Sequence, residues 1–211
     1  MKRIIEIMKK NSHIDSSNEP EAVIIIGPPG SGKSHITKKL TNKFVILDID
    51  ELRCEPDHQL DEFDEAIYRF RTQADAEKRR EDLMERYILE RKNIVIPALT
   101  GSKRWYETAL NIHYSGYKVN FVFIATTKET CRKNIESKLK KEREEKGYGI
   151  IIEDDFFEYS FKSIPNLLLT ILKDRLKVIN SCIIVNQEGQ TYKFSKEEGY
   201  NFLKAEYIKN K

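Results

Sequence analysis

A short apolar run that leads straight into a glycine-rich loop constrains this chain more than any other feature. Residues 23–26 are Val-Ile-Ile-Ile, four β-branched residues of the kind found in a buried parallel strand. The sequence Gly-Pro-Pro-Gly-Ser-Gly-Lys-Ser follows at 27–34, and Ile36 and Leu40 then have helical spacing. A strand, this loop and a helix in that order make a complete Walker A motif, or P-loop.

The residue types of this loop explain how it can hold phosphate. Glycines let backbone N–H groups turn inward without obstruction by a Cβ atom, and the helix N-terminus adds partial positive charge. Lys33 is expected to reach the β- and γ-phosphates, and the Ser34 hydroxyl to ligate Mg²⁺. We therefore predict binding of ATP, or of GTP in its place, with Mg²⁺ through Gly27, Pro28, Pro29, Gly30, Ser31, Gly32, Lys33, Ser34 and His35.

Composition narrows the class of protein. A chain of 211 residues suits one domain with a sizeable core, and a net charge of +3 is too balanced to favour nucleic acid as the main partner. The three cysteines have no metal-ligand spacing and are typical of reduced thiols in the cytoplasm. No segment is long and apolar enough to span a bilayer, so we expect a cytoplasmic protein with no membrane partner.

Strands alternate with helices along the chain. We divide it into an N-terminal helix and polar lead-in, residues 1–21, and one P-loop kinase domain, residues 22–211. Strands are expected at 22–27, 44–47, 94–96, 119–125 and 178–185, with a short edge strand at 192–194. Helices are expected at 33–42, 61–91, 103–115, 128–145, 153–173 with an interruption at Pro165, and 196–208. This order predicts an α/β fold with a doubly wound, mainly parallel sheet.

Two carboxylates follow the second predicted strand. Asp48 and Asp50 would lie at the carboxyl edge of the sheet, where the P-loop also lies and where open α/β sheets bind ligands. We assign Asp50 as the base that accepts a proton from an attacking hydroxyl, and Asp48 as the more structural or Mg²⁺-linked partner. We expect Arg53 to point into the same crevice and to pair there with Asp50 or with an anionic substrate. Thr100, after the third strand, is assigned as a substrate-binding residue.

The third strand and the charged helix beyond it refine this assignment. The segment 93–100 ends without a carboxylate, which argues against a motor-type ATPase. Residues 138–146 carry dense charge before two glycines, where a kinase lid would lie. A lid cation neutralises charge on the transferred phosphoryl group, and we assign Arg143 to this role, with Lys140 and Lys141 as alternatives.

Four stretches resemble the zeta toxins. They are Gly-Pro-Pro-Gly-Ser-Gly-Lys-Ser at 27–34, Ile-Leu-Asp-Ile-Asp-Glu-Leu-Arg at 46–53, Asn-Ile-Val-Ile at 93–96 with Gly-Tyr at 116–117, and Ile-Pro-Asn-Leu at 164–167 with Gln-Glu-Gly at 187–189. Zeta toxins are P-loop kinases that phosphorylate UDP-N-acetylglucosamine and related UDP-amino sugars, and many are the toxin of a toxin–antitoxin pair. The resemblance implies Lys33 and Ser34 as nucleotide and Mg²⁺ residues, Asp50 as base, Glu81 as a substrate contact, and an antitoxin as possible partner.

The chain departs from that family pattern at two places. Pro-Ala-Leu stands at 97–99, where the family has an acid followed by small residues. Ile-Ile-Ile-Glu stands at 150–153, where the family has an arginine before a Thr-Pro pair, so Arg143 is the expected substitute. Two alternatives stay open: a polynucleotide 5′-kinase, whose Asp-x-x-Arg pattern Asp50 and Arg53 match, and a non-catalytic nucleotide-binding module.

Overall fold

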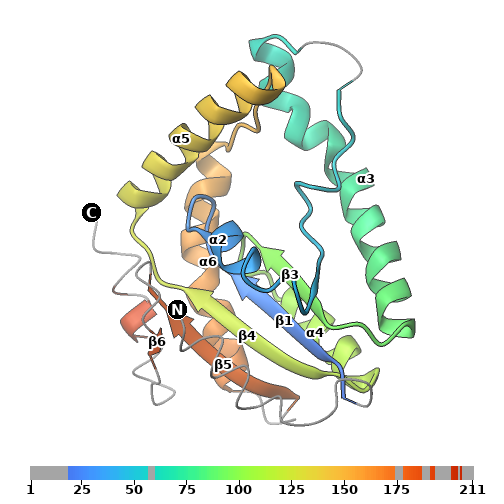
Figure 1. Ribbon diagram of the computed structural model, residues 1–211. Helices are drawn as coiled ribbons and strands as arrows, with labels where there is room; N and C mark the ends of the chain where they lie inside the picture. The colour runs from blue at the N-terminus through green and yellow to red at the C-terminus, as the bar shows by residue number, and fades with distance from the viewer. Residues whose placement is uncertain are drawn as a thin grey trace.

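A computed structural model describes residues 19–56, 60–173, 178–186, 191–192, 201–203 and 205. Its centre is a six-stranded sheet of order β2-β3-β1-β4-β5-β6 (Figure 1). The strands are β1 (Glu21–Ile26), β2 (Val45–Ile46), β3 (Ile94–Ala98), β4 (Lys118–Ile124), β5 (Ile179–Val185) and β6 (Thr191–Tyr192). The first five are parallel and β6 pairs antiparallel with β5, which confirms the predicted fold class.

The helices account for most of the remaining described chain. They are α2 (Lys33–Thr37), α3 (Glu62–Leu89), α4 (Arg104–Tyr114), α5 (Lys128–Lys146) and α6 (Asp154–Leu172). Residues 201–203 and 205 are also helical, within the predicted closing helix. The predicted N-terminal helix lies outside the described residues.

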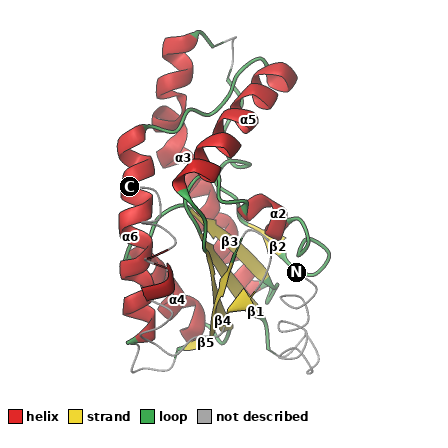
Figure 2. Cartoon of the chain, turned by 90° about the vertical axis from the view of Figure 1, so that its left-hand side faces the viewer, coloured by secondary structure: helices red, strands yellow, loops and turns green. Residues whose placement is uncertain are grey.

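Strand β1 explains why the sheet has two covered faces. It lies between β3 and β4, and all six of its residues are buried. Ile24 and Ile26 belong to a core that α3, α4 and α6 cover, whereas Val23 and Ile25 belong to a second core with residues that follow α2. Figure 2 shows α2 on one side of the sheet and α4 and α6 on the other. The run of β-branched residues is therefore apolar throughout because both of its faces are buried.

Side-chain and glycine caps fix the ends of the two helices that matter most for the site. Asp61 accepts a hydrogen bond from the backbone of Asp64 at the start of α3, and Thr127 does the same for Thr130 at the start of α5. Gly147 ends α5 in the left-handed conformation, with φ of 79°. In Figure 1, α5 slopes away from the sheet and meets the N-terminal end of α3.

Two expectations about helices are wrong. The helix α2 ends at Thr37 and not near residue 42, because residues 38–43 form turns. The helix α6 continues through Pro165 without the expected interruption. Pro165 is buried among Ile164, Leu167 and Leu168, so packing against the core outweighs the lost backbone hydrogen bond.

Candidate active site

The P-loop connects β1 to α2 and is fixed from two directions. The Gly27 amide donates to the carbonyl of Ala98 in β3 (3.1 Å), and Asn134 in α5 donates to the Gly30 carbonyl (2.7 Å). Gly30 has φ of 75°, and a Cβ atom there would lie 2.2 Å from the Cys131 carbonyl oxygen. Only glycine fits at this point, because both the backbone angle and the close approach of α5 exclude a side chain.

Lys33 lies inside this loop. The residue is 8% exposed, and its Nζ donates to the carbonyls of Gly27 (2.6 Å) and Pro28 (2.9 Å). Burial lowers the pKa of Lys33 to about 8. Ser34 and His35 lie on the exposed first turn of α2. The ammonium group is thus held where phosphate oxygens would enter the loop.

Asp48 and Asp50 follow β2 in one tight turn. The Asp50 amide donates to the Asp48 carboxylate (3.1 Å). Burial, and then the charge of Asp50, raise the pKa of Asp48. Burial alone would also raise the pKa of Asp50, but Lys138 and Arg53 outweigh it and lower that pKa. Asp50 is therefore ionised, as a proton acceptor must be.

Arg53 holds Asp50 from the side of α3. Its Nε lies 3.4 Å from Asp50 Oδ1, and its other nitrogens donate to the Arg69 carbonyl (3.0 Å), Thr72 (2.8 Å) and Gln73 (2.7 Å). The guanidinium group thus joins the turn that carries the carboxylates to the long helix. This is a positioning contact, where the sequence suggested either a pair with Asp50 or a substrate contact.

A cavity of about 390 Å³ joins the P-loop to these carboxylates. Besides residues 29–34 and 48–50, it is lined by Pro97 in β3 and Leu99 just after that strand, by one face of α5, and by Ile150 and Ile152. Among the described residues, the cations that line it are Lys33, Lys138 and Lys141. The size suits a small-molecule ligand.

The donor set at this cavity fits a magnesium ion. The Ser34 hydroxyl and the Asp48 carboxylate both line it, and both are hard oxygen ligands. The described residues contain no group of three or more His, Cys, Asp or Glu side chains that would hold a metal by themselves. Mg²⁺ in phosphoryl-transfer sites needs only one or two protein ligands, because phosphate and water supply the rest.

Three predicted site residues lie away from this cavity. Arg143 forms a double ion pair with Glu65 of α3, with Nε at 2.9 and 3.1 Å from its two oxygens. Glu81 pairs with Arg104 of α4 on the surface. Thr100 precedes Gly101, whose amide donates to Ser163 of α6 (2.9 Å). None of these three is among the residues that line the cavity.

Two arginines on the inner face of α3 were missed from the sequence. Arg80 is 7% exposed, has no hydrogen-bond acceptor among the described residues, and lies 5.0 Å from the ring of Trp105. Arg69 lies 3.9 Å from the ring of Phe156, and its Nε also lacks a described partner. Burial lowers the pKa of both arginines; Asp50 partly opposes this at Arg69, and Glu77, Glu81 and then Asp48 oppose it at Arg80. Neither arginine is among the residues that line the cavity. The two arginines are eleven residues, or three helical turns, apart, so they lie on the same face of the helix. This spacing was the signal in the sequence that could have identified them.

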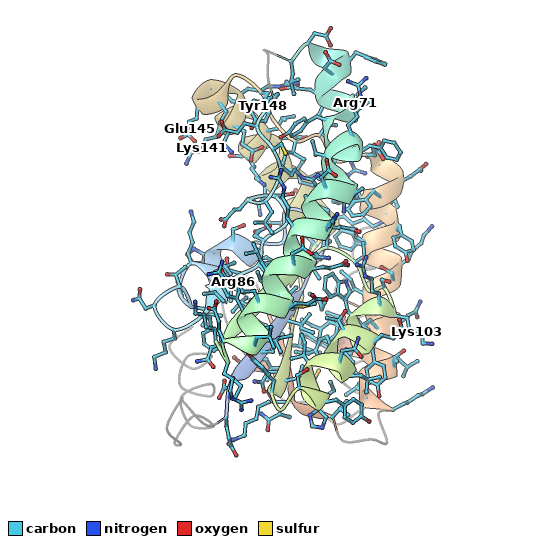
Figure 3. All side chains as sticks on the ribbon, turned by 90° about the vertical axis from the view of Figure 1, so that its right-hand side faces the viewer. Arg71, Arg86, Lys103, Lys141, Glu145 and Tyr148 are labelled. Atoms are coloured by element: carbon cyan, nitrogen blue, oxygen red, sulfur yellow. The ribbon has the colours of Figure 1, made fainter. Side chains whose placement is uncertain are left out.

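The tip of α5 leans against the upper half of α3. Figure 3 shows Lys141, Glu145 and Tyr148 together at the height of Arg71, with Arg86 farther along α3. The ring of Tyr148 meets that of Tyr68 edge to face at 5.3 Å.

No helix in the described part of the chain combines the length and hydrophobicity needed to cross a membrane.

Solved structures share this architecture. A protein of the PezAT chromosomal toxin–antitoxin system of the human pathogen Streptococcus pneumoniae has a TM-score of 0.74 and 18% identity, over 97% of this chain and 85% of that one. A protein from Chloroflexus aurantiacus has a TM-score of 0.56 and 11% identity, over 89% and 98%. A chain of the Pnkp1/Rnl/Hen1 RNA repair complex has a TM-score of 0.52 and 21% identity, over 79% and 48%. At these identities the likeness shows the fold.

Sequence comparison gives the family. No protein of curated function matches this sequence. The family model described as Zeta toxin matches residues 5–198, which is most of the chain and includes the P-loop, the carboxylates and the whole of α5. This protein belongs to the zeta toxin family of P-loop kinases.

Proposed function

We propose that this protein is an ATP- and Mg²⁺-dependent kinase that transfers the γ-phosphoryl group to a hydroxyl of a UDP-amino sugar, with UDP-N-acetylglucosamine as the first acceptor to test. One observation carries the proposal. A carboxylate held ionised by two cations, Asp50, lines the same cavity as an intact P-loop. The family match supports the same reaction class.

The residues of the cavity would divide the work of phosphoryl transfer. The acceptor oxygen attacks the γ-phosphorus, its proton passes to the Asp50 carboxylate, and the bond to the bridging oxygen of ADP breaks. Lys33 and the P-loop amides hold the phosphates in line. Mg²⁺, held through Ser34 and Asp48, supplies charge neutralisation when bound.

The arginines of α3 support an anionic acceptor. Arg69 and Arg80 have donors without a hydrogen-bond partner among the described residues; Asp50 attracts Arg69, and Glu77, Glu81 and then Asp48 attract Arg80. Burying a cation without a partner is costly, so an anionic ligand that reached these donors would offset that cost. The diphosphate of a sugar nucleotide is a ligand of that kind, and guanidinium groups suit phosphate geometry.

A polynucleotide 5′-kinase is the second candidate. The Asp-x-x-Arg pattern favours it, but the Arg53 donors are used by α3 and Asp50, which leaves little for a nucleic-acid phosphate. The near-neutral charge argues against it as well.

We further propose an antitoxin partner in the cytoplasm, since the S. pneumoniae protein belongs to a toxin–antitoxin system.

The deciding experiment is a mass-resolved assay with Mg²⁺-ATP and UDP-N-acetylglucosamine. We expect a phosphorylated sugar nucleotide from the wild type and a loss of at least about 100-fold in rate for Asp50→Asn, because general bases contribute that much or more. Asp82→Asn, an exposed acid on α3, is the matched control and should keep the wild-type rate. Product from a 5′-hydroxyl oligonucleotide alone would favour the second candidate. ATP binding without any transfer would favour a non-catalytic module.

A further inference from the structure

The helix α5 presents one polar face to the cavity. Asn134, Ser137, Lys138 and Lys141 recur at spacings of three and four residues, and all of them line it. Because Asn134 also holds the Gly30 carbonyl, this face is fixed to the P-loop and its side chains keep their position relative to the phosphate site.

Lys138 differs from every other cation of the charged segment 138–146. Its Nζ lies 3.4 Å from Asp50 Oδ2 and 3.5 Å from Glu142. Lys141 pairs with Glu145 on the surface, and Arg143 is bound to Glu65. Of these cations, Lys138 alone contacts the predicted base while lining the nucleotide cavity.

Lys138 and Lys33 line the same cavity, together with Asp50 and the P-loop. The Lys138 side chain is 54% exposed and makes a long contact with Asp50, so it has room to change partner. A γ-phosphate entering that region would carry more negative charge than the single carboxylate of Asp50.

We propose that Lys138, and not Arg143, is the cation that stabilises the transferred phosphoryl group, and that it exchanges Asp50 for the γ-phosphate when ATP binds. The proposal rests on the proposed function for its catalytic part, but not for the phosphate contact. The exchange does two things at once. It places a charge on the oxygens that become more negative during transfer, and it frees the Asp50 carboxylate for the acceptor hydroxyl.

The phosphate contact is tested by nucleotide binding, without any acceptor. We expect Lys138→Met to weaken binding of a non-hydrolysable ATP analogue by about tenfold or more, as for loss of a charge-assisted hydrogen bond. ADP binding should change less than about twofold, because ADP lacks the γ-phosphate. Lys138→Arg should recover most of the loss. Lys133→Met, an exposed lysine that pairs with Glu129 on the same helix, should bind both nucleotides as the wild type does.

The exchange itself is tested by a double-mutant cycle. Asp50→Asn should tighten binding of the ATP analogue, since it removes the resting partner of Lys138, and the gain should shrink in the Lys138→Met background. Equal gains in both backgrounds would overturn the exchange. Equal losses of ATP-analogue and ADP affinity in Lys138→Met would overturn the γ-phosphate contact.

Transfer assays separate this inference from the proposed function. If the wild type phosphorylates an acceptor, we expect Lys138→Met to lower kcat by about 100-fold or more, and Arg143→Met to lower it far less. Wild-type kcat in Lys138→Met would overturn the inference while the kinase assignment stands. If no acceptor is phosphorylated by the wild type, the proposed function fails, and the ATP–ADP difference alone still decides whether Lys138 contacts the γ-phosphate.

Discussion

Single residues in this site are constrained by their backbone as much as by their chemistry. Gly30 and Gly32 both adopt positive φ, at 75° and 89°, yet their surroundings differ. A Cβ on Gly30 would collide with the Cys131 carbonyl of α5, whereas nothing lies within 4 Å of one on Gly32. The two positions therefore separate the cost of backbone strain from the cost of crowding.

We predict that Gly30→Ala destabilises the protein more than Gly32→Ala does. Both variants should lose about 1–2 kcal/mol to the left-handed backbone, and Gly30→Ala should lose about 1–3 kcal/mol more because α5 must move. Urea unfolding of the two variants beside the wild type gives the difference. Equal losses of stability in the two variants would mean that α5 does not lie as close to Gly30 as it does in the structure.

At the scale of elements, Glu65 joins α3 to α5 and to the loop that follows it. It accepts from Arg143 and from the Gly149 amide (2.7 Å), and its side chain is 5% exposed. The Arg143 hydrogen bonds lower the pKa of Glu65. Arg143, which the sequence suggested as a lid cation, thus links α5 to α3 through Glu65.

The sign of the Glu65 shift makes its contribution to stability depend on pH. With a folded-state pKa below the usual 4.5, Glu65 stabilises the fold fully above about pH 4.5. The contribution is lost as pH falls through the lowered pKa. We expect Glu65→Gln to be less stable than the wild type at pH 7, and the gap to narrow towards pH 3, in urea titrations across that range. A gap that is constant with pH would contradict the assignment. Glu144→Gln, from an exposed pair with Lys140, is the control.

Sequence periodicity was sufficient for the elements but not for contacts between them. The strands, the P-loop and the two carboxylates were predictable because each depends on neighbours within a few residues. The partners of Arg143 and Lys138 were not, since Glu65 is 78 residues from the first and Asp50 is 88 from the second. The helix through Pro165 was missed for a related reason, because packing of α6 against the core overrode a local rule.

For the molecule as a whole, the sheet is the buried centre, and the site lies beside the P-loop and α5. The central strands are fully buried between two cores. The cavity is lined by the P-loop, the turn after β2, the end of β3 and the residue that follows it, one face of α5 and the loop before α6. Ligand in this cavity would therefore connect segments from residue 29 to residue 152, and should stabilise the folded chain as one unit.

Mg²⁺-ATP should thus raise the melting temperature. A ligand at 100 times its Kd adds about 2.7 kcal/mol to the free energy of unfolding. In a chain of this size each kcal/mol is worth about 2–4 °C, so the expected rise is roughly 5–11 °C. Differential scanning calorimetry with and without nucleotide measures it. Lys33→Met should lose most of the rise, because the buried ammonium is the main cation of the loop, whereas Lys133→Met should keep it. If Mg²⁺-ATP leaves the melting temperature of the wild type unchanged, this intact P-loop does not hold the nucleotide. The kinase assignment would then be wrong.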